Sequence, residues 1–465
     1  MTPAPAPPPA PPALVPLRRN LRFQALWAGQ ASATLGMVIG DTAFPLLVLA
    51  LTGSSTSAGA FGAVQMVAAL LLGVHGGAVA DRANRRRVLI AADTARLLAL
   101  ASVPVALAFG PPNLAHLLLV AAVIGATIAY SGPVRLLALR SVVPPEQLSQ
   151  ALTQDEARMS GAALAGPPLA GFLFGLGHAV PFLGAALASL LAVTAAVAVR
   201  FPSPHESGAP GEGDRGSALA GFRVLAASPL LRNALAVLLV INLAGAALLL
   251  PVMVLLREHG TGSAGIGLAL AGEAVGALAG TALVARLHRL AGPGVLLLGV
   301  AWSAVPVPLA PLLPGGAPTV FAALFVYGAG VPTLRVMLDL LVFRQVPDAL
   351  RGRVIAATMT LLTAGMPAGT FATGLLLDHS SPTTALAAIS AVLAAALLAA
   401  TVSRTLRHAT WPTDEPATGP AEEPTAEPTA GPAPEPAPGP TTGSTAGSTA
   451  GSTAGSAARS SAPRD

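Results

Sequence analysis

Cysteine and lysine are both absent from this chain. Without cysteine there can be no disulfide bond, no thiolate metal site and no cysteine nucleophile. Aromatic residues make up only 4% of the chain, so aromatic stacking can contribute little to ligand binding. Charged residues make up 10%, whereas soluble globular proteins carry about 25%. With 53% hydrophobic residues, the composition is typical of a protein that crosses a membrane many times.

Arginine supplies all 26 basic residues, and the formal net charge is +5. A basic protein can bind nucleic acid, but that function needs arginines gathered on one soluble face. Here the arginines fall in short segments between long apolar runs. They therefore indicate how membrane helices are oriented, and we expect no nucleic-acid partner.

Several enzyme motifs are also missing. No Gly-x-x-x-x-Gly-Lys-Ser/Thr phosphate loop is present, which excludes ATP binding of that type. The eight histidines are scattered without His-x-x-x-His spacing, and no Gly-x-Ser-x-Gly elbow follows a strand. We therefore expect no enzyme, no cofactor and no metal site.

Twelve apolar runs remain when the sequence is cut at charged residues and at breaks rich in glycine or proline. A helix that spans a bilayer needs about 20 apolar residues. The sequence thus predicts an all-α polytopic membrane protein of twelve transmembrane helices. The expected spans are 23–51, 58–80, 88–109, 114–139, 157–177, 181–199, 231–256, 265–285, 294–313, 319–343, 354–377 and 383–402.

The loop arginines test this number of spans. Cytoplasmic loops accumulate arginine and lysine. If both termini are cytoplasmic, Arg257 is the only arginine in the predicted outer loops, and all other loop arginines lie on the cytoplasmic side. We therefore expect a multi-pass protein of the bacterial inner membrane with cytoplasmic N- and C-termini.

A polar gap divides the spans into two sets of six, and the two sets echo each other. Pro144-Pro-Glu-Gln-Leu148 follows the fourth span, as Val346-Pro-Asp-Ala-Leu350 follows the tenth. Two six-helix pseudo-repeats are an architecture of secondary transporters. We expect a disordered Pro/Ala-rich N-terminus at 1–17, six-helix bundles at 18–200 and 229–403, a flexible cytoplasmic linker at 201–228, and a disordered cytoplasmic tail at 404–465.

The loop between the second and third spans carries the most informative motif, Gly76-Gly-Ala-Val-Ala-Asp-Arg-Ala-Asn-Arg-Arg-Arg-Val-Leu89. It resembles the loop signature of the major facilitator superfamily. An ordinary cytoplasmic loop would explain the arginines, but not the glycines and the acid in their places. Asn84 replaces the usual second glycine, and asparagine readily adopts the left-handed turn conformation. The matching residues are Gly77, Ala80, Asp81, Arg82, Arg85, Arg86 and Leu89.

The resemblance implies a role for this loop as a conformational lock, formed by Gly77, Asp81, Arg82, Arg85 and Arg86. In the family, the acid faces the N-terminus of the eleventh helix, whose dipole favours an anion. The contact forms when the cytoplasmic side is closed, so it stabilises the outward-facing state.

Two further resemblances concern the direction of transport. In the fifth span, Gly166-Pro167-Pro-Leu-Ala-Gly171 looks like the motif shared by drug:proton antiporters of this superfamily, although a packed Gly/Ala-rich helix would have a similar sequence. The segment 20–30 together with Gly40-Asp41 resembles the branch that contains siderophore exporters and macrolide-efflux proteins.

Charged residues inside spans are functional candidates, because they are energetically unfavourable in a membrane. Asp41 lies deepest, and a buried carboxyl group favours its protonated form. It is either a proton carrier or an acid hydrogen-bonded to a neighbour such as Gln30, Gln65 or Arg135. Arg135 is its candidate counter-charge. Glu273 has no charged neighbour along its helix, which makes it a second candidate for a proton or a cationic substrate.

Other charges within the spans have local partners in the sequence. Asp93 and Arg96 lie three residues apart, and Arg335 and Asp339 lie four apart, so each pair falls on one helix face. We expect both pairs to be structural. We expect Arg158, at the start of the fifth span, to be solvated.

Taken together, the resemblances imply a secondary transporter that works as a monomer. Its substrate would be a lipophilic or amphipathic small molecule (a drug, a macrolide-like compound or a siderophore), exported by alternating access in exchange for protons. Two alternatives stay open. One is an importer or facilitator of a small nutrient on the same fold, and the other is a receptor or scaffold that transports nothing.

Overall fold

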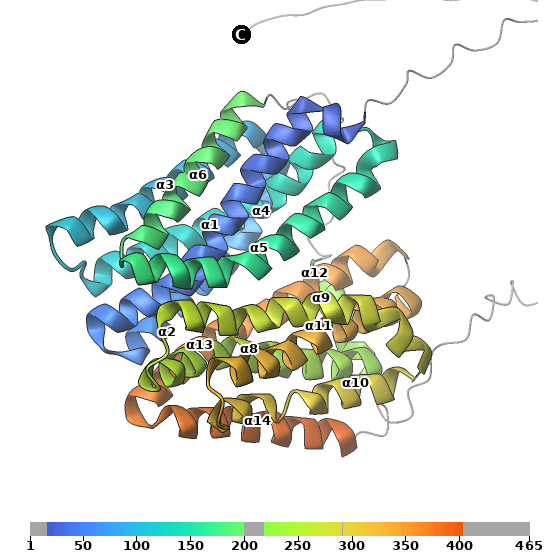
Figure 1. The fold of residues 1–465 in the computed structure, drawn as a ribbon. Coiled ribbons are helices and arrows are strands. Elements are labelled where there is room, and N and C mark those ends of the chain that lie inside the picture. The colour runs from blue at the N-terminus through green and yellow to red at the C-terminus, as the bar shows by residue number, and fades with distance from the viewer. Residues whose placement is uncertain (1–15, 200–217, 291, 347, 403–465) are drawn as a thin grey trace, which may run out of the picture. The chain divides into compact units, whose positions relative to one another are not determined.

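The computed structural model describes residues 16–199, 218–290, 292–346 and 348–402, and within these ranges every regular element is a helix (Figure 1). Residues 1–15 of the predicted N-terminal segment, most of the predicted linker and the whole predicted tail lie outside the described residues. The first half contains η1 (Leu17–Arg19), α1 (Leu21–Thr52), α2 (Ser55–Arg82), α3 (Arg85–Phe109), α4 (Leu114–Val142), η2 (Pro145–Gln147), α5 (Leu148–Leu176) and α6 (Val180–Ala198). The second half contains α7 (Ala218–Ala227), α8 (Pro229–Glu258), α9 (Ser263–Leu290), α10 (Pro293–Ser303), η5 (Val307–Leu312), α11 (Ala317–Gln345), α12 (Asp348–Ala364), α13 (Met366–His379) and α14 (Pro382–Val402).

The predicted number of spans is confirmed, because the described residues contain 12 helical segments long and apolar enough to cross a membrane. Two of these segments are broken helices. The span formed by α10 and η5 changes to a 3-10 helix at Pro306, since Pro306, Pro308 and Pro311 cannot donate main-chain hydrogen bonds. The span formed by α12 and α13 breaks at Gly365, and Pro367 then starts the new helix. The orientation of the termini stays a prediction.

Asparagine and serine side chains begin several of the long helices. The side chain of Asn20 accepts a hydrogen bond from the main-chain N–H of Phe23 at 3.1 Å, and Asn113 accepts one from His116 at 2.8 Å. Each satisfies a donor that the first helical turn leaves free. The chain reverses between α1 and α2 at Gly53, whose φ of 66° suits glycine.

Asn84 departs from the left-handed conformation that we expected for it. Its φ is −64° and its ψ is 108°, and its side chain accepts hydrogen bonds from the main-chain N–H groups of Arg86 and Arg87 at 3.1 and 3.2 Å. Asparagine at this position therefore acts as the N-cap of α3, a role that glycine cannot fill with a side chain.

Each half has its own apolar core. In the first half α1 packs on α5 and α6, and α2 packs on α4. The rings of Phe44 and Phe61 stack there with centroids 4.3 Å apart. In the second half α9 packs on α11, and α8 packs on α13 and α14. The short helix α7 packs on α12 and forms the last part of the segment predicted as a linker.

The halves meet through α2 with α13 and through α5 with α9. We call the end of the bundles that carries Gly53 the Gly53 end, and the opposite end, which carries Asn84, the Asn84 end. Figure 1 shows α5 close to α9 at the Gly53 end, where α5 ends and α9 begins, and the two ribbons diverge toward the Asn84 end.

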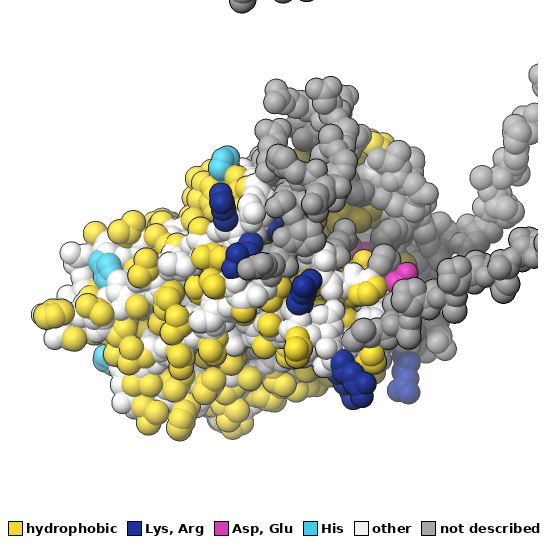
Figure 2. All heavy atoms as spheres, turned by 90° about the horizontal axis from the view of Figure 1, so that it is seen from above, with side chains coloured by type: hydrophobic (Ala, Val, Ile, Leu, Met, Phe, Trp, Pro, Cys, Tyr) yellow, Lys and Arg dark blue, Asp and Glu magenta, His cyan; other side chains and the backbone are white. Residues whose placement is uncertain are grey.

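Hydrophobic side chains cover much of the described surface that faces the viewer in Figure 2. The exposed fraction is 73% for Leu71, 64% for Leu98 and 91% for Phe109, and these values suit side chains that face lipid instead of water. Arg158 is an exception to our expectation, because it is buried with 8% exposed. It binds Asp155 at 2.7 Å and donates to the main-chain carbonyl of Gln30 on α1 at 3.0 Å, so it joins α5 to α1.

Candidate functional site

A cavity of about 320 Å³ lies between the two halves, with walls from α1, α2, α8, α9, α11 and α13. Most of its lining is apolar, including Phe61, Met66 and Met366. Both halves contribute a carboxylate, Asp41 from α1 and Glu273 from α9, and both side chains are exposed to the cavity. The structure therefore brings together two of the three intramembrane residues that the sequence singled out.

Asp41 is fixed by a partner on the neighbouring helix. Gln65 Nε2 on α2 donates a hydrogen bond to Asp41 Oδ1 at 2.9 Å. Gln65 was one of the three neighbours that the sequence offered for this acid. On the other side of α1, Asp41 shares a small cavity of about 10 Å³ with Arg96. The arginine beside this cavity is thus Arg96, whereas Arg135, which we had expected to be the counter-charge of Asp41, pairs with Asp93.

Glu273 owes its place to the close packing of α9 on α11. A Cβ at Gly328 would overlap the main-chain carbonyl of Glu273, and a Cβ at Gly276 would overlap that of Phe325. Only glycines allow the two backbones to approach so closely. Within the described part of the chain, the Glu273 carboxylate has no hydrogen-bond or ion-pair partner.

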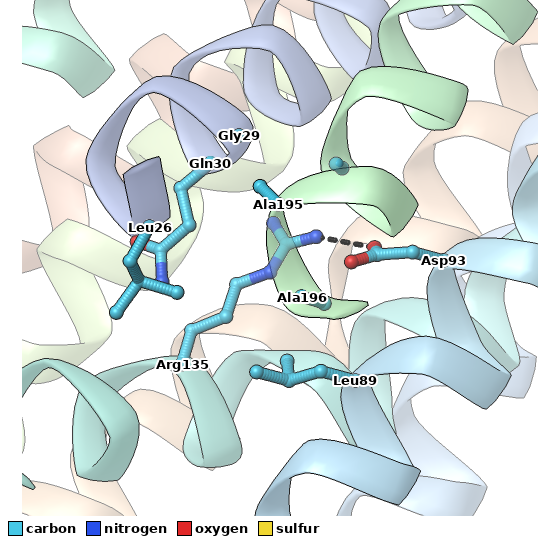
Figure 3. A pocket seen from close by; sticks show the side chains of 9 residues that line it. Leu26, Gly29, Gln30, Leu89, Asp93, Arg135, Ala195 and Ala196 are labelled. Atoms are coloured by element: carbon cyan, nitrogen blue, oxygen red, sulfur yellow. Dashed lines mark hydrogen bonds and ion pairs between the residues drawn. The ribbon is translucent and has the colours of Figure 1, made fainter. Parts of the chain in front are cut away.

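Arg135 lies away from the cavity, in a buried cluster between α3 and α4 (Figure 3). Arg135 Nη2 is 2.6 Å from Asp93 Oδ1, and Figure 3 shows its guanidinium group turned toward that carboxylate. Arg96 Nη1 is 3.7 Å from the same oxygen, which confirms the expected pair along α3. Arg96 also donates to the Thr127 hydroxyl at 2.9 Å. One carboxylate therefore holds two buried arginines.

This cluster includes donors without acceptors. Arg135 Nε, Arg96 Nη1 and Gln30 Nε2 are buried and have no hydrogen-bond partner among the residues that the structure describes. Figure 3 shows Gln30 on α1 facing the Arg135 side chain. The small cavity beside Arg135 measures only about 10 Å³, so it has no room for an organic substrate. The arrangement suits a structural or coupling role for Arg135 more than contact with a substrate.

The loop signature lies at the Asn84 end, where α2 meets α3. Arg86 binds within its own half, because it donates to the main-chain carbonyls of Ala196 and Val197 at the end of α6. A Cβ at Gly77 would meet open space, so packing within this conformation does not require glycine there. Arg85 Nε is buried and has no partner. The side chains of Asp81 and Arg82 lie outside the described residues, and the predicted lock stays a prediction.

The fifth-helix motif lies at contacts with two other helices. A Cβ at Gly166 would collide with Val38 on α1. A Cβ at Gly171 would collide with the Ser263 carbonyl oxygen, and the Pro167 carbonyl lies against Gly267 on α9. The small residues of this motif thus allow the first half to touch the second at the Gly53 end.

Asp378 joins the halves, although the sequence did not single it out. It lies near the end of α13 and accepts hydrogen bonds from the first residues of α2. The donors are the Ser54 hydroxyl at 2.7 Å and the main-chain N–H groups of Ser55 and Thr56 at 2.7 and 3.0 Å. The carboxylate occupies the N-terminus of a helix, where an anion is favoured. Asp378 follows an ordinary apolar run, and nothing in a single sequence indicates that it meets Ser54.

The geometry is therefore that of a central, mostly apolar cavity with one acid from each half. At the Gly53 end the halves are held together by Asp378 and by the glycine contacts of α5 and α2. A second cavity of about 110 Å³ shares Asn242, Val331 and Met366 with the central one and contains Arg335. There Arg335 pairs with Asp339 at 3.9 Å, as expected from their spacing.

Comparison with known sequences agrees with this geometry. The sequence signature of a family described as "Transmembrane secretion effector" matches residues 12–428. The chain is 29% identical over 382 residues to the multidrug efflux pump Tap of Mycobacterium tuberculosis (strain ATCC 25618 / H37Rv), a match that covers 77% of this chain and 88% of that protein. The multidrug efflux pump Tap of Mycolicibacterium fortuitum is 28% identical over 394 residues, which cover 79% of this chain and 91% of that protein.

Solved structures show the same fold at low sequence identity. A bacterial homologue of the human lysosomal transporter Spinster, inward-facing and unoccupied, aligns with a TM-score of 0.64 and 15% identity over 83% of this chain and 96% of that one. A bacterial homologue of the iron transporter ferroportin in an inward-facing state aligns with a TM-score of 0.61 and 17% identity over 82% of this chain and 99% of that one. These likenesses confirm the predicted twelve-helix transporter fold.

Proposed function

Because this chain belongs to the transmembrane secretion effector family of major facilitator transporters, we propose that it exports a small molecule in exchange for protons. It is a multi-pass protein of the bacterial plasma membrane, and its relatives are transporters instead of enzymes. The proposal adds three things to that identity: the direction of transport, the coupling ion and the nature of the substrate.

The observation that carries the proposal is the central cavity. Its walls are mostly apolar and its volume of about 320 Å³ falls within the usual range of small-molecule sites. Such a site suits a lipophilic or amphipathic molecule. A carboxylate from each half faces this cavity, so a proton and a substrate can both interact with groups that belong to the moving halves. The efflux activity named for the Tap proteins supports export as the direction.

The contacts at the two ends support alternating access. In this proposal the Asn84 end, which carries the loop arginines, faces the cytoplasm, and the closed Gly53 end faces outward. The cavity then corresponds to an inward-facing state, which suits an exporter that collects its substrate from the cytoplasm or the inner leaflet. In the opposite state the Asn84 end would close, and Asp81 at the end of α2 would face the N-terminus of α12, which begins at Asp348.

Asp41 is the proton carrier in this proposal. Its carboxylate faces the cavity, is oriented by Gln65 and lies roughly 16 Å along the helix axis from the Gly53 end of α1, well inside the membrane. A proton bound there would be released to whichever side the cavity faces. Coupling follows if substrate leaves for the outside as protons enter.

Efflux from a pump-deficient bacterium tests the proposal. Cells that express wild type, Asp41→Asn or the control Glu258→Gln at matched membrane levels are loaded with macrolides, lipophilic dyes or catechol siderophores. Glu258 is an exposed acid at the end of α8, outside the cavity lining. We expect efflux that a protonophore abolishes, that Asp41→Asn loses and that Glu258→Gln retains. Energy-dependent accumulation would instead identify an importer. If the protein inserts into the membrane but transports none of the compounds, a receptor would be favoured.

A further inference from the structure

We infer that the central cavity selects a lipophilic ammonium ion that carries at least one N–H, and that Glu273 is the residue that recognises its charge. This inference deepens the proposed function and rests on it for the location of the substrate site. It rests on which hydrogen-bonding groups of the cavity are still free, and on which charges face it.

The hydroxyl groups of the cavity can only accept from a ligand, because their hydrogens are already used. Each hydroxyl group has a single hydrogen to donate, and an amide group has two. The Tyr327 hydroxyl donates to the Ile241 carbonyl at 2.8 Å, and the Thr370 hydroxyl donates to the Met366 carbonyl at 2.9 Å. A ligand whose polar atoms are all acceptors would find no free hydroxyl hydrogen here.

Each of the two lining amides has one of its two N–H groups engaged within the protein. Gln65 donates to Asp41 at 2.9 Å, and Asn242 donates to the main-chain carbonyl of Leu238 at 2.9 Å. The carboxylate of Glu273 and the carbonyl oxygen of Asn242 remain as acceptors. Glu273 is the free acceptor that can carry a full charge, and it is complementary to a ligand with N–H donors.

The acids of the cavity lining can supply only negative charge. Its lining contains Asp41 and Glu273 but no arginine and no histidine. The nearest arginines are already paired. Arg96 lies behind α1, is 1% exposed and binds Asp93 and Thr127, and Arg335 lies in the adjoining cavity beside Asp339. An anionic ligand would meet uncompensated negative charge, whereas a cation would be attracted.

The two carboxylates differ in their hydrogen-bond and charge partners. Asp41 accepts a hydrogen bond from Gln65 and lies near the Arg96 guanidinium group. Glu273 has neither a hydrogen-bond donor nor a paired guanidinium group among the described residues. A charge held away from bulk water without a partner is energetically unfavourable, and a bound cation removes that penalty. Glu273 is therefore the site for the ligand's ammonium group, which leaves Asp41 free for the proton of the proposed exchange.

The rest of the lining fits the apolar part of such a ligand. Phe61, Leu249 and Leu250 form rigid walls, while Met66 and Met366 can adapt to different shapes because their side chains are unbranched. The Tyr327 hydroxyl packs against α8 at Gly245. A Cβ at position 245 would overlap this hydroxyl, so the packing requires glycine there. Anionic compounds such as catechol siderophores do not fit this chemistry.

Equilibrium binding to the purified full-length protein in detergent provides the test. The probes are a fluorescent lipophilic tertiary amine, its N-methyl quaternary derivative, and a neutral amide analogue on the same skeleton, all at neutral pH. We expect wild type to bind the tertiary amine about tenfold or more tightly than the neutral analogue, as for a desolvated charge pair. We expect the quaternary ion, which lacks an N–H, to fall between them.

Variants of Glu273 test whether this residue causes the preference for the amine. Glu273→Gln should bind the amine and the neutral analogue with similar affinity, while Glu273→Asp and the control Glu258→Gln should keep the preference for the amine. Glu273→Asp also guards against a folding defect, since it alters the same position. A preference for the amine that persists in Glu273→Gln would overturn the inference, as would tighter binding of the neutral analogue by wild type.

Failure of the inference can be told apart from failure of the proposed function. Binding is measured without any gradient, so an amine preference that depends on Glu273 supports the inference even if no export is found. Protonophore-sensitive export of neutral and cationic compounds alike, unaffected by Glu273→Gln, would support the proposed function and overturn the inference.

Discussion

The carboxylate of Asp378 accepts a hydrogen bond from the Ser54 hydroxyl at 2.7 Å, and this contact joins two halves of the molecule across 324 residues of sequence. It lies at the opposite end of the helices from the predicted lock. Asp378 ends α13 and contacts the start of α2, whereas Asp81 ends α2 and is expected to face the start of α12. The predicted lock and the Asp378 contact would stabilise opposite states of an alternating-access cycle.

Removing the Asp378 carboxylate should weaken the conformation described here. Because Asp378 is exposed, its three hydrogen bonds should contribute only about 1 kcal/mol, so Asp378→Ala should shift the equilibrium roughly fivefold toward the opposite state. The cysteine-free chain allows a direct measurement with the pair Gly62→Cys and Thr370→Cys. An ideal Cβ at position 62 lies 3.0 Å from a methyl carbon of Thr370, so a short reagent can link the two.

We expect less cross-linking in Asp378→Ala than in the parent protein, and no change in the control Glu258→Ala, which removes an exposed acid at the same end. Equal yields in the parent and Asp378→Ala would mean that this contact does not hold the halves together.

Removing the Asp81 charge should act in the opposite direction. If Asp81 stabilises the state in which the Asn84 end is closed, Asp81→Asn should increase the yield of the same cross-link and lower transport. The fold should be unaffected, because Arg86 and Asn84 hold the start of α3 and the end of α6 without Asp81. Combining Asp81→Asn with Asp378→Ala should restore a yield close to that of the parent. A yield in Asp81→Asn that equals the parent's would remove the support for the lock.

Glycine at position 171 should be needed for transport, because it allows α5 and α9 to touch at the closed Gly53 end. A Cβ there would collide with the Ser263 carbonyl oxygen on α9, a main-chain atom that cannot move aside without displacing the helix. Gly171→Ala should therefore lower efflux about tenfold and destabilise the described state by roughly 1–3 kcal/mol. Gly161→Ala is the matched control on the same helix, since a Cβ at Gly161 meets open space. Similar efflux by the two variants would show that the α5–α9 contact is not required.

The long apolar runs and the arginine distribution were enough to predict the helices of this fold, because both reflect the membrane itself and do not depend on tertiary contacts. The breaks at Pro306 and Gly365 were not predicted, although the three prolines of η5 are a visible signal. Asn84 was assigned the wrong conformation, since the glycine that it replaces suggested a turn and not a helix cap.

The site was only partly accessible to the same reasoning. Asp41 and Glu273 could be found because carboxylates are rare inside spans, but their convergence on one cavity depends on how each helix is rotated. Arg135 was associated with the wrong acid, because spacing reveals partners along one helix and not between helices. Arg158 looked solvated near a helix start, yet α1 packs over it. Contacts between distant segments require the structure.

The Asp93 cluster should matter more for stability than for transport. Asp93 is 3% exposed and neutralises part of the charge of Arg96 and Arg135, so Asp93→Asn would remove the carboxylate with which both guanidinium groups form ion pairs. The loss of one partner from a buried ion pair typically costs about 3–5 kcal/mol. The thermal unfolding midpoint of the purified protein in detergent should fall accordingly.

Asp339→Asn provides the comparison, because it breaks the exposed Arg335–Asp339 pair at 3.9 Å, which should contribute about 1 kcal/mol or less. If the two variants unfold at the same temperature, the buried cluster is not a major source of stability, and the unpaired donors of Arg96 and Arg135 would then point to a role in coupling.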